Sequence, residues 1–112
     1  MARVATAELE ARVRLDGEQA VIELAGDIDR DAEEALDSAY SQVESAQTVV
    51  LDFTDVPYIN STGIAVIVGL LARARANRQT LGARGLSEHY RQIFEITRLA
   101  DFMTIIGGEG PR

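Results

Sequence analysis

The chain has 112 residues, a formal net charge of −7 and no cysteine. The lack of cysteine excludes disulfides and thiolate metal sites, and the acidic balance opposes binding to nucleic acid or to an anionic membrane. No signal segment is visible, and the longest apolar run, residues 63–72, is shorter than the roughly 20 residues of a membrane span. We therefore expect one cytoplasmic domain over residues 1–112, suited to a basic protein partner.

The first part of the chain predicts a hairpin followed by a helix. Two stretches of alternating apolar residues flank Asp16-Gly17, which is a strong hairpin signal. Residues 29–45 then show apolar residues at helical spacing, with Asp29 or Asp31 as the cap. The first strand of the hairpin is expected to place its apolar residues on one face: Leu9, Ala11, Val13 and Leu15.

The rest of the chain alternates strands and helices. Residues 48–56 are a β-branched run typical of a strand covered on both faces. A helix is expected from about Thr62 to Asn77, a weak strand over 80–86, and a third helix opened by Ser87. Residues 101–106 fit a short helix or an edge strand, and 107–112 are expected to fray. This order predicts an α/β fold with a partly parallel sheet.

Two adjacent hydroxyls mark the loop over residues 55–62. Loops at the carboxyl ends of parallel strands often carry function, and this loop is one of them. Ser61 fits the N-cap of the next helix, where its hydroxyl would satisfy a backbone N–H. Ser61 and Thr62 together exceed what one cap requires, Gly63 leaves the first turn open to another molecule, and a helix N-terminus attracts phosphate. The sequence allows both a simple cap and a reactive site.

The helix after this loop is apolar around most of its circumference. Its core stripe is expected at Ile64, Ile67, Val68, Leu71 and Ala74. Apolar residues are left over on the remaining face, which is either buried or presented to a partner: Ala65, Val66, Gly69 and Leu70.

Three stretches, AGDIDRDAEEAL, VVLDFTDVPYINSTGIAVIVGLL and SEHYRQIFEITRLADF, together resemble a STAS domain, the family of bacterial anti-sigma-factor antagonists. The centre of the resemblance is residues 59–64, INSTGI, in place of a hydrophobic–Asp–Ser–(Ser/Thr)–Gly–hydrophobic motif. The resemblance implies a small mixed sheet of about four to five strands with helices mainly on one face. It also implies a binding protein, without enzymatic activity or a cofactor, that sequesters a kinase-type anti-sigma factor and so frees a sigma factor.

The resemblance further implies a phosphorylation switch. The serine kinase would transfer the γ-phosphoryl group of ATP to Ser61, with Thr62 as the second candidate, and a phosphatase would reverse the reaction. Asp27 and Asp29 match an acidic pair beside the site, and Asn60 and Gly63 would help to shape it. Partner contacts are expected on both sides of the site, at Tyr58, Ile59, Ile64, Val66 and Leu70.

Two positions depart from the family pattern. Asn60 replaces the usual aspartate, so phosphorylation would be slow or absent if that charge activates the hydroxyl. A non-phosphorylated, homo-oligomeric subunit of a stressosome-like assembly therefore stays open, as does a sensor of a nucleotide or another small ligand. Arg98 stands where relatives often have glycine, and a local adjustment at the helix end is expected.

Two other functional readings fail on the residues present. The acidic positions 27, 29 and 31 begin like a calcium-binding loop, but Ala32 and Ser38 stand where that loop needs glycine and glutamate. His89 is the sole histidine and a G-x-S-x-G elbow is absent, which opposes a hydrolase. We expect no metal site.

Overall fold

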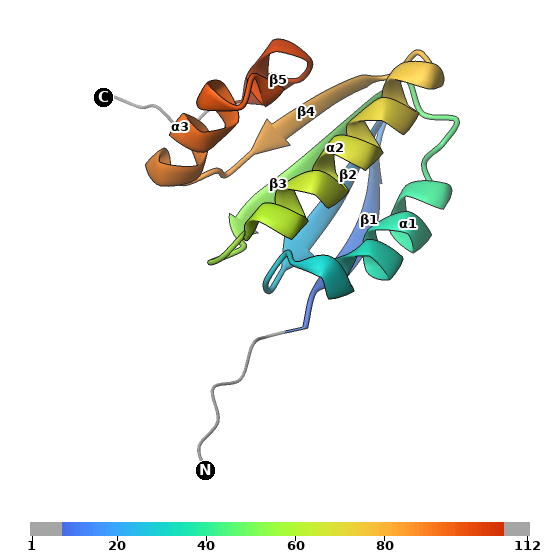
Figure 1. Ribbon diagram of the computed structural model, residues 1–112. Coiled ribbons are helices and arrows are strands. Elements are labelled where there is room, and N and C mark those ends of the chain that lie inside the picture. The colour runs from blue at the N-terminus through green and yellow to red at the C-terminus, as the bar shows by residue number, and fades with distance from the viewer. Residues whose placement is uncertain (1–7, 107–112) are drawn as a thin grey trace.

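A mixed five-stranded sheet forms the centre of the computed structural model, which describes residues 8–106 (Figure 1). The strands lie in chain order, with β1 and β2 antiparallel and all other neighbours parallel. The elements are β1 (Glu10–Asp16), β2 (Gln19–Ala25), the 3₁₀ turn η1 (Arg30–Ala32), α1 (Glu33–Ser41), β3 (Thr48–Asp55), α2 (Ser61–Ala76), β4 (Thr80–Arg84), α3 (Glu88–Ile96), the 3₁₀ turn η2 (Leu99–Asp101) and β5 (Thr104–Ile106).

The predicted hairpin between β1 and β2 is confirmed. Asp16 pairs with Gln19, so two residues form the turn. Gly17 has a φ of 70°, a left-handed conformation that glycine adopts without strain. Leu9 is buried on the helix side as expected, but Leu15 is 73% exposed because it lies beside the turn, at the open end of the sheet.

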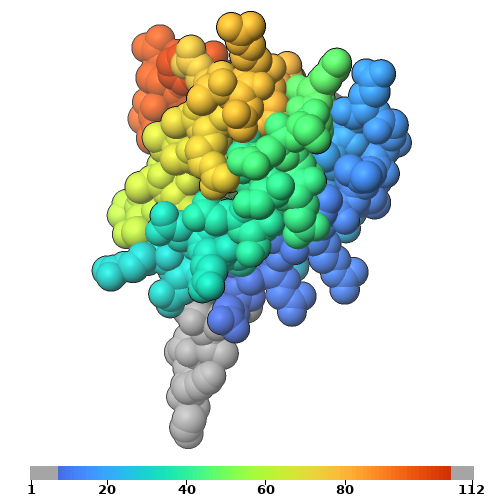
Figure 2. Space-filling model, turned by 90° about the vertical axis from the view of Figure 1, so that its right-hand side faces the viewer, coloured from blue at the N-terminus to red at the C-terminus, as the bar shows by residue number. Residues whose placement is uncertain are grey.

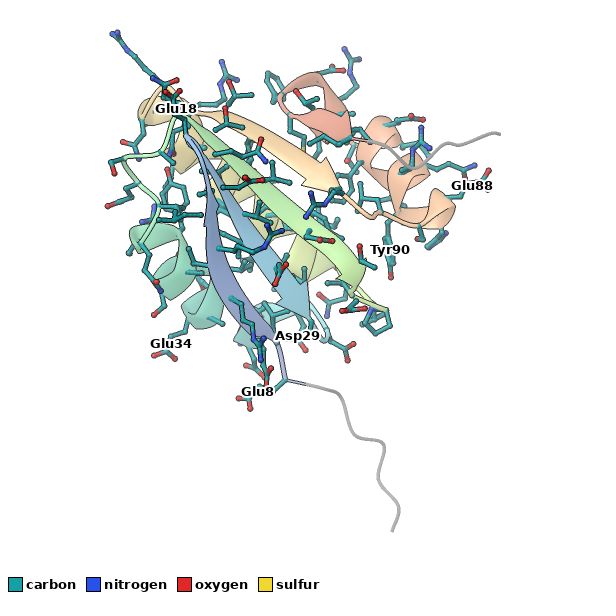
Figure 3. All side chains as sticks on the ribbon, turned by 180° about the vertical axis from the view of Figure 1, so that it is seen from behind. Glu8, Glu18, Asp29, Glu34, Glu88 and Tyr90 are labelled. Atoms are coloured by element: carbon teal, nitrogen blue, oxygen red, sulfur yellow. The ribbon has the colours of Figure 1, made fainter. Side chains whose placement is uncertain are left out.

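The connections between the parallel strands place the helices on one face of the sheet. Figure 1 shows α1 and α2 lying across this face and α3 next to β4 and β5. The view from behind in Figure 3 shows the other face without a helix across it. The expected fold class, a small mixed sheet with helices mainly on one face, is confirmed.

The core lies between the sheet and the helices. Alternate residues of the two central strands point into it, among them Ile22 and Leu24 of β2 and Leu51 and Phe53 of β3. Ile67 of α2 packs against the same cluster. This packing fixes α2 above β3, and thereby fixes the position of its N-terminus at the carboxyl end of the sheet.

The face without helices corrects one expectation. β3 is not covered on both faces by other elements, although Val50, which faces away from the core cluster, is only 1% exposed. Val21 on the neighbouring β2 is equally buried and pairs with Val50. An ion pair between Asp52 of β3 and Arg84 of β4, at 3.0 Å, lies near this face, because Asp52 is two residues after Val50 on the same strand.

The C-terminal part resolves the remaining expectations. Residues 80–84 form β4, as predicted, and Ser87 caps α3 by accepting a hydrogen bond from the Tyr90 backbone N–H at 3.2 Å. The ambiguous residues 101–106 end in the short edge strand β5, whereas 107–112 lie outside the described residues. Within residues 8–106, every helix is too short or too polar to cross a membrane.

Candidate functional site

The loop that precedes the two hydroxyls, residues 56–60, runs from the end of β3 to the start of α2. Ile59 in this loop forms an isolated parallel bridge with Ile28, which follows β2. The Ile28 N–H donates to the Tyr58 carbonyl at 2.9 Å, and the Asn60 N–H donates to the Ile28 carbonyl at 3.2 Å. The loop is therefore held at the carboxyl ends of β2 and β3, where the sequence predicted a functional site.

Asn60 caps α2, which corrects the prediction that Ser61 is the cap. The Asn60 backbone is extended, and its side-chain oxygen accepts a hydrogen bond from the Gly63 N–H at 2.7 Å. Asparagine and serine are both favoured caps, so residue type alone did not separate the two positions. With Asn60 as the cap, Ser61 becomes the first helical residue.

Ser61 and Thr62 are both exposed in the first turn of α2. This turn contains no acidic residue, so no carboxylate within it offsets the positive end of the helix dipole near the two hydroxyls. The helix cap leaves the Ser61 hydroxyl accessible to another molecule. The cap interpretation for Ser61 is wrong, and its role as a reactive site stays a prediction.

Gly63 allows close packing within this chain and does not leave space for another molecule. The residue is buried, and a Cβ atom at this position would lie 1.9 Å from the Ile28 carbonyl oxygen. The first turn of α2 thus packs directly on the backbone that bridges to Ile59. The expected open approach at Gly63 is wrong because this chain fills the space itself.

The acidic pair flanks the bridge. Asp27 and Asp29 lie on either side of Ile28, next to the loop, and Asp29 is labelled in Figure 3. The Asp29 carboxylate accepts a hydrogen bond from the Asp31 N–H at 2.9 Å and caps η1, as one of the two predicted caps. No group of His, Cys, Asp or Glu within residues 8–106 is arranged to hold a metal ion.

Two expectations about the apolar circumference of α2 are wrong. Leu70 is buried at 3% exposure in the core, whereas Val68, assigned to the core stripe, is 45% exposed. Ile59, expected to contact a partner, is also buried, at 6% exposure. Among the other expected contacts, Tyr58 is 50% exposed and Ile64 and Val66 are half-buried, so these side chains stay accessible.

The outward face of α2 is a narrow apolar surface, which we call the α2 strip. It begins one helical turn after Ser61, and Figure 2 shows the surfaces of η1 and α1 beside that of α2. No polar side chain interrupts the strip, and its central glycine has open space around the position of a Cβ atom. The strip consists of exposed small or apolar residues: Ala65, Val68, Gly69 and Ala72.

Tyr90 contributes to the site in a way that the sequence did not indicate. Its hydroxyl accepts a hydrogen bond from the Ile59 N–H at 2.9 Å. The residue is buried, at 9% exposure. No local pattern reveals this contact, because the two residues are 31 positions apart in the chain.

A family model described as "Mlab, STAS domain" matches residues 11–106. The chain belongs to the STAS-domain family. The anti-sigma-B factor antagonist of Listeria monocytogenes is 38% identical over 69 residues, which are 62% of this chain and 60% of that protein. The Staphylococcus epidermidis protein of the same name is 34% identical over 65 residues, or 58% of this chain and 60% of the relative. The matched region of this STAS domain thus spans about three fifths of these relatives.

Solved structures show the same STAS fold. The anti-sigma factor antagonist SpoIIAA in its unphosphorylated form aligns with a TM-score of 0.68 at 17% identity, covering 88% of this chain and 89% of that one. An anti-sigma factor antagonist from Mycobacterium paratuberculosis aligns with a TM-score of 0.73 at 19% identity, covering 87% and 84%. At these identities, the likeness establishes the fold alone.

Proposed function

We propose that this STAS domain is a cytoplasmic anti-sigma-factor antagonist whose binding to a kinase-type anti-sigma factor is controlled by phosphorylation of Ser61. The observation that carries the proposal is the exposure of Ser61 at the first turn of α2, at the end of the α2 strip. The names of the Listeria and Staphylococcus relatives support this class of function. The chain itself acts as a binding protein, and the kinase supplies the catalysis.

The proposed modification is a phosphoryl transfer from ATP. The Ser61 oxygen attacks the γ-phosphorus, the bond from that phosphorus to the β–γ bridging oxygen breaks, and ADP leaves. The hydroxyl proton passes to a base of the kinase. The product phosphate lies at the N-terminus of a 16-residue helix, where backbone N–H groups and the helix dipole favour negative charge. Phosphorylation should therefore leave the fold intact.

The switch would act at the interface with the partner. A phosphate adds about −1.5 to −2 charges. If the partner covers the α2 strip, this charge must lose water beside Ala65 and Val68, which is costly unless new hydrogen bonds replace the water. A cost of roughly 3 kcal/mol corresponds to a fall of about a hundredfold in affinity.

Asn60 is compatible with this mechanism as far as the fold is concerned. Its side-chain oxygen is the acceptor for the Gly63 N–H, a role that the carboxylate of an aspartate fills equally well. The substitution changes the charge near the hydroxyl and keeps the cap. Asn60→Asp therefore tests whether a carboxylate at this position speeds phosphorylation.

The first experiment identifies the phosphate acceptor. The chain is incubated with ATP and each candidate anti-sigma kinase, and its intact mass is measured. We expect the gain of one phosphoryl group in the wild type and in Thr62→Ala, and none in Ser61→Ala. Phosphorylation of Ser61→Ala would transfer the role to another residue.

The second experiment measures binding to the same kinase. Ser61→Ala should bind like the unphosphorylated wild type. Ser61→Glu should bind at least about tenfold more weakly, because it places a negative charge at the interface. This loss is smaller than the one expected for phosphate, because glutamate carries less charge. Equal affinity of the two variants would reject the switch. If no kinase modifies the wild type and size-exclusion chromatography shows a large assembly, the scaffold interpretation replaces this proposal.

A further inference from the structure

The loop before Ser61 is held from two opposite sides. On one side, the backbone of Ile28 bonds to Tyr58 and to Asn60. In such a bridge, the N–H of the residue between them, Ile59, points away from Ile28. That N–H meets the hydroxyl of Tyr90, which comes from α3. The loop thus lies between one backbone partner and one side-chain partner.

The Tyr90 hydroxyl takes the place of a strand carbonyl. Ile59 is 6% exposed and Tyr90 is 9% exposed, so water has little access to their hydrogen bond. A buried N–H that loses its partner is strongly unfavourable. Figure 3 shows Tyr90 beside the carboxyl end of β3, where it joins α3 to the loop. Without this hydroxyl, the Ile59 N–H would lose its partner, and the hydrogen bonds of residues 58–60 to distant segments would come only from Ile28.

We propose that Tyr90 is a positioning residue that holds the Ser61 loop in the conformation that the kinase phosphorylates. This inference rests on the proposed function. Only one residue, the cap Asn60, separates the Ile59 amide from Ser61, so a shift of Ile59 changes the first turn of α2 directly. The α2 strip begins one helical turn later and is held by core packing of Ile67 and Leu70. Loss of the Tyr90 hydroxyl should therefore misplace Ser61 without altering the docking surface.

Tyr90→Phe removes only the oxygen and tests this proposal. We expect kcat for phosphorylation of Ser61 to fall about tenfold, with KM within about twofold of the wild-type value, because positioning affects the reacting geometry more than docking. The matched control is Tyr40→Phe. Tyr40 is also buried and its hydroxyl accepts a hydrogen bond from Asn77 at 2.9 Å, beyond the C-terminal end of α2. That variant should keep the wild-type kcat.

Amide hydrogen exchange supplies a readout that needs no kinase. The Ile59 amide should exchange at least about tenfold faster in Tyr90→Phe than in the wild type, while Tyr40→Phe leaves it unchanged. In the wild type alone, the Ile59 amide should be protected relative to that of Thr62, which lacks an intrahelical acceptor. This comparison tests the hydrogen bond between Ile59 and Tyr90 even if Tyr90→Phe does not fold.

The outcomes separate this inference from the proposed function. Equal kcat values for the two folded tyrosine variants, or an unprotected Ile59 amide in the wild type, would overturn the role of Tyr90. If no kinase phosphorylates the wild type, the proposed function fails. The role of Tyr90 as a positioning residue for phosphorylation falls with it, whereas its hold on the loop is still decided by the exchange rates.

Discussion

Arg98 occupies a backbone conformation that suits glycine better. Its φ is 69°, in the left-handed region, directly after the C-cap Thr97 of α3. Non-glycine residues are disfavoured there because Cβ approaches the carbonyl oxygen. The local adjustment that the sequence predicted at Arg98 is this left-handed turn, and an exposed ion pair from Arg98 to Asp101 at 2.6 Å accompanies it.

Replacement of Arg98 should separate the backbone effect from the ion pair. Arg98→Gly and Arg98→Ala both lose the contact with Asp101, but only glycine relieves the conformation. We expect the unfolding free energy of Arg98→Gly to exceed that of Arg98→Ala by about 1 kcal/mol in urea titrations. An alanine variant as stable as the glycine variant would show that φ carries no cost here.

Single residues also show where sequence reasoning stops. Asn60 and Ser61 are neighbours of equal capping preference, and only the backbone path decides which of them precedes the helix. The sequence suggested that Gly63 leaves space for a ligand. The backbone of Ile28 fills this space, but Ile28 is 35 positions away in the chain, so no local pattern reveals the contact. Local preference thus misassigned the cap and the role of Gly63, whereas the role of Ser61 stays a prediction.

Helix α2 contains two glycines with opposite surroundings. Gly63 packs on the Ile28 carbonyl, whereas a Cβ atom at Gly69 would have nothing within 4 Å. Gly63→Ala should lower the unfolding free energy by roughly 3 kcal/mol through overpacking. Gly69→Ala should raise it by about 1 kcal/mol, because alanine is the better helix former.

Urea unfolding of Gly63→Ala and Gly69→Ala measures whether the unfolding free energy falls in the first variant and rises in the second. Each variant is the control for the other, because both place alanine in the same helix. Stabilisation by Gly63→Ala would contradict the close contact with Ile28. Gly69 has no packing reason within the described chain, and its lack of a side chain would allow a partner backbone to approach the α2 strip closely.

The face of the sheet without helices contains a carboxylate with a shifted pKa. Partial burial acts to raise the pKa of Asp52, but it is outweighed by hydrogen bonds from the Thr54 hydroxyl at 2.6 Å and backbone N–H at 3.0 Å, and by the Arg84 guanidinium. The pKa of Asp52 is therefore lowered below 3.8. Folding thus favours the ionised form.

The sign of the resulting pH dependence follows from this direction. Ionised Asp52 stabilises the fold above the unfolded-state pKa of about 4, and the contribution is lost as the pH falls through the lower folded-state pKa. Asp52→Asn should therefore be less stable than the wild type at pH 7, and the difference should shrink below about pH 4. Urea titrations at both pH values test this.

Thr54→Val provides the matching control for Asp52. This variant removes the hydroxyl donor and should move the pKa of Asp52 upward in an NMR titration. An unchanged pKa would contradict the role of the hydroxyl. A stability difference between wild type and Asp52→Asn that grew as the pH fell would contradict the direction of the shift.

Helices and strands were predictable from the sequence wherever one face of the element is apolar and the opposite face is polar. Helical periodicity over residues 29–45 predicted a helix, and the structure forms η1 and α1 within this range, with Leu36 and Tyr40 in the core. In α2, apolar residues occur on every side, so the pattern has little contrast and the assignments of Val68 and Leu70 were exchanged. Only packing on the sheet decides between them.

At the scale of the molecule, acidic residues are concentrated in the first half of the chain and basic residues in the second half. Residues 1–55 contain fourteen of the eighteen acidic residues and only four of the eleven basic ones. The described part of this segment, residues 8–55, forms β1 to β3, η1 and α1, so most acidic residues lie on these elements. A partner with basic groups there would be attracted before contact.

Charge reversal tests this attraction. Glu34 on α1 and Glu95 on α3 are both exposed, and Glu34→Lys should slow association with the kinase several-fold at low salt, whereas Glu95→Lys should change it little. Stopped-flow association rates should also fall as salt rises from about 0.05 to 0.5 M. Equal effects of both reversals would contradict an acidic docking side.

Contacts between distant segments were beyond sequence reasoning. The Ile28–Ile59 bridge and the Tyr90 hydrogen bond unite three segments of the chain at one loop. Each segment has an ordinary local pattern, and only the sheet topology brings them together. The fold class was predictable from the order of elements, but the internal support of the loop was not.

The turn between β1 and β2 has a practical use. Gly17 and Glu18 lie at the amino end of β2, opposite the edge where Ser61 is found, and Glu18 is exposed. Because the chain has no thiol of its own, Glu18→Cys would create a unique attachment point. A fluorophore or surface linker placed there would report on complex formation from the far end of the molecule.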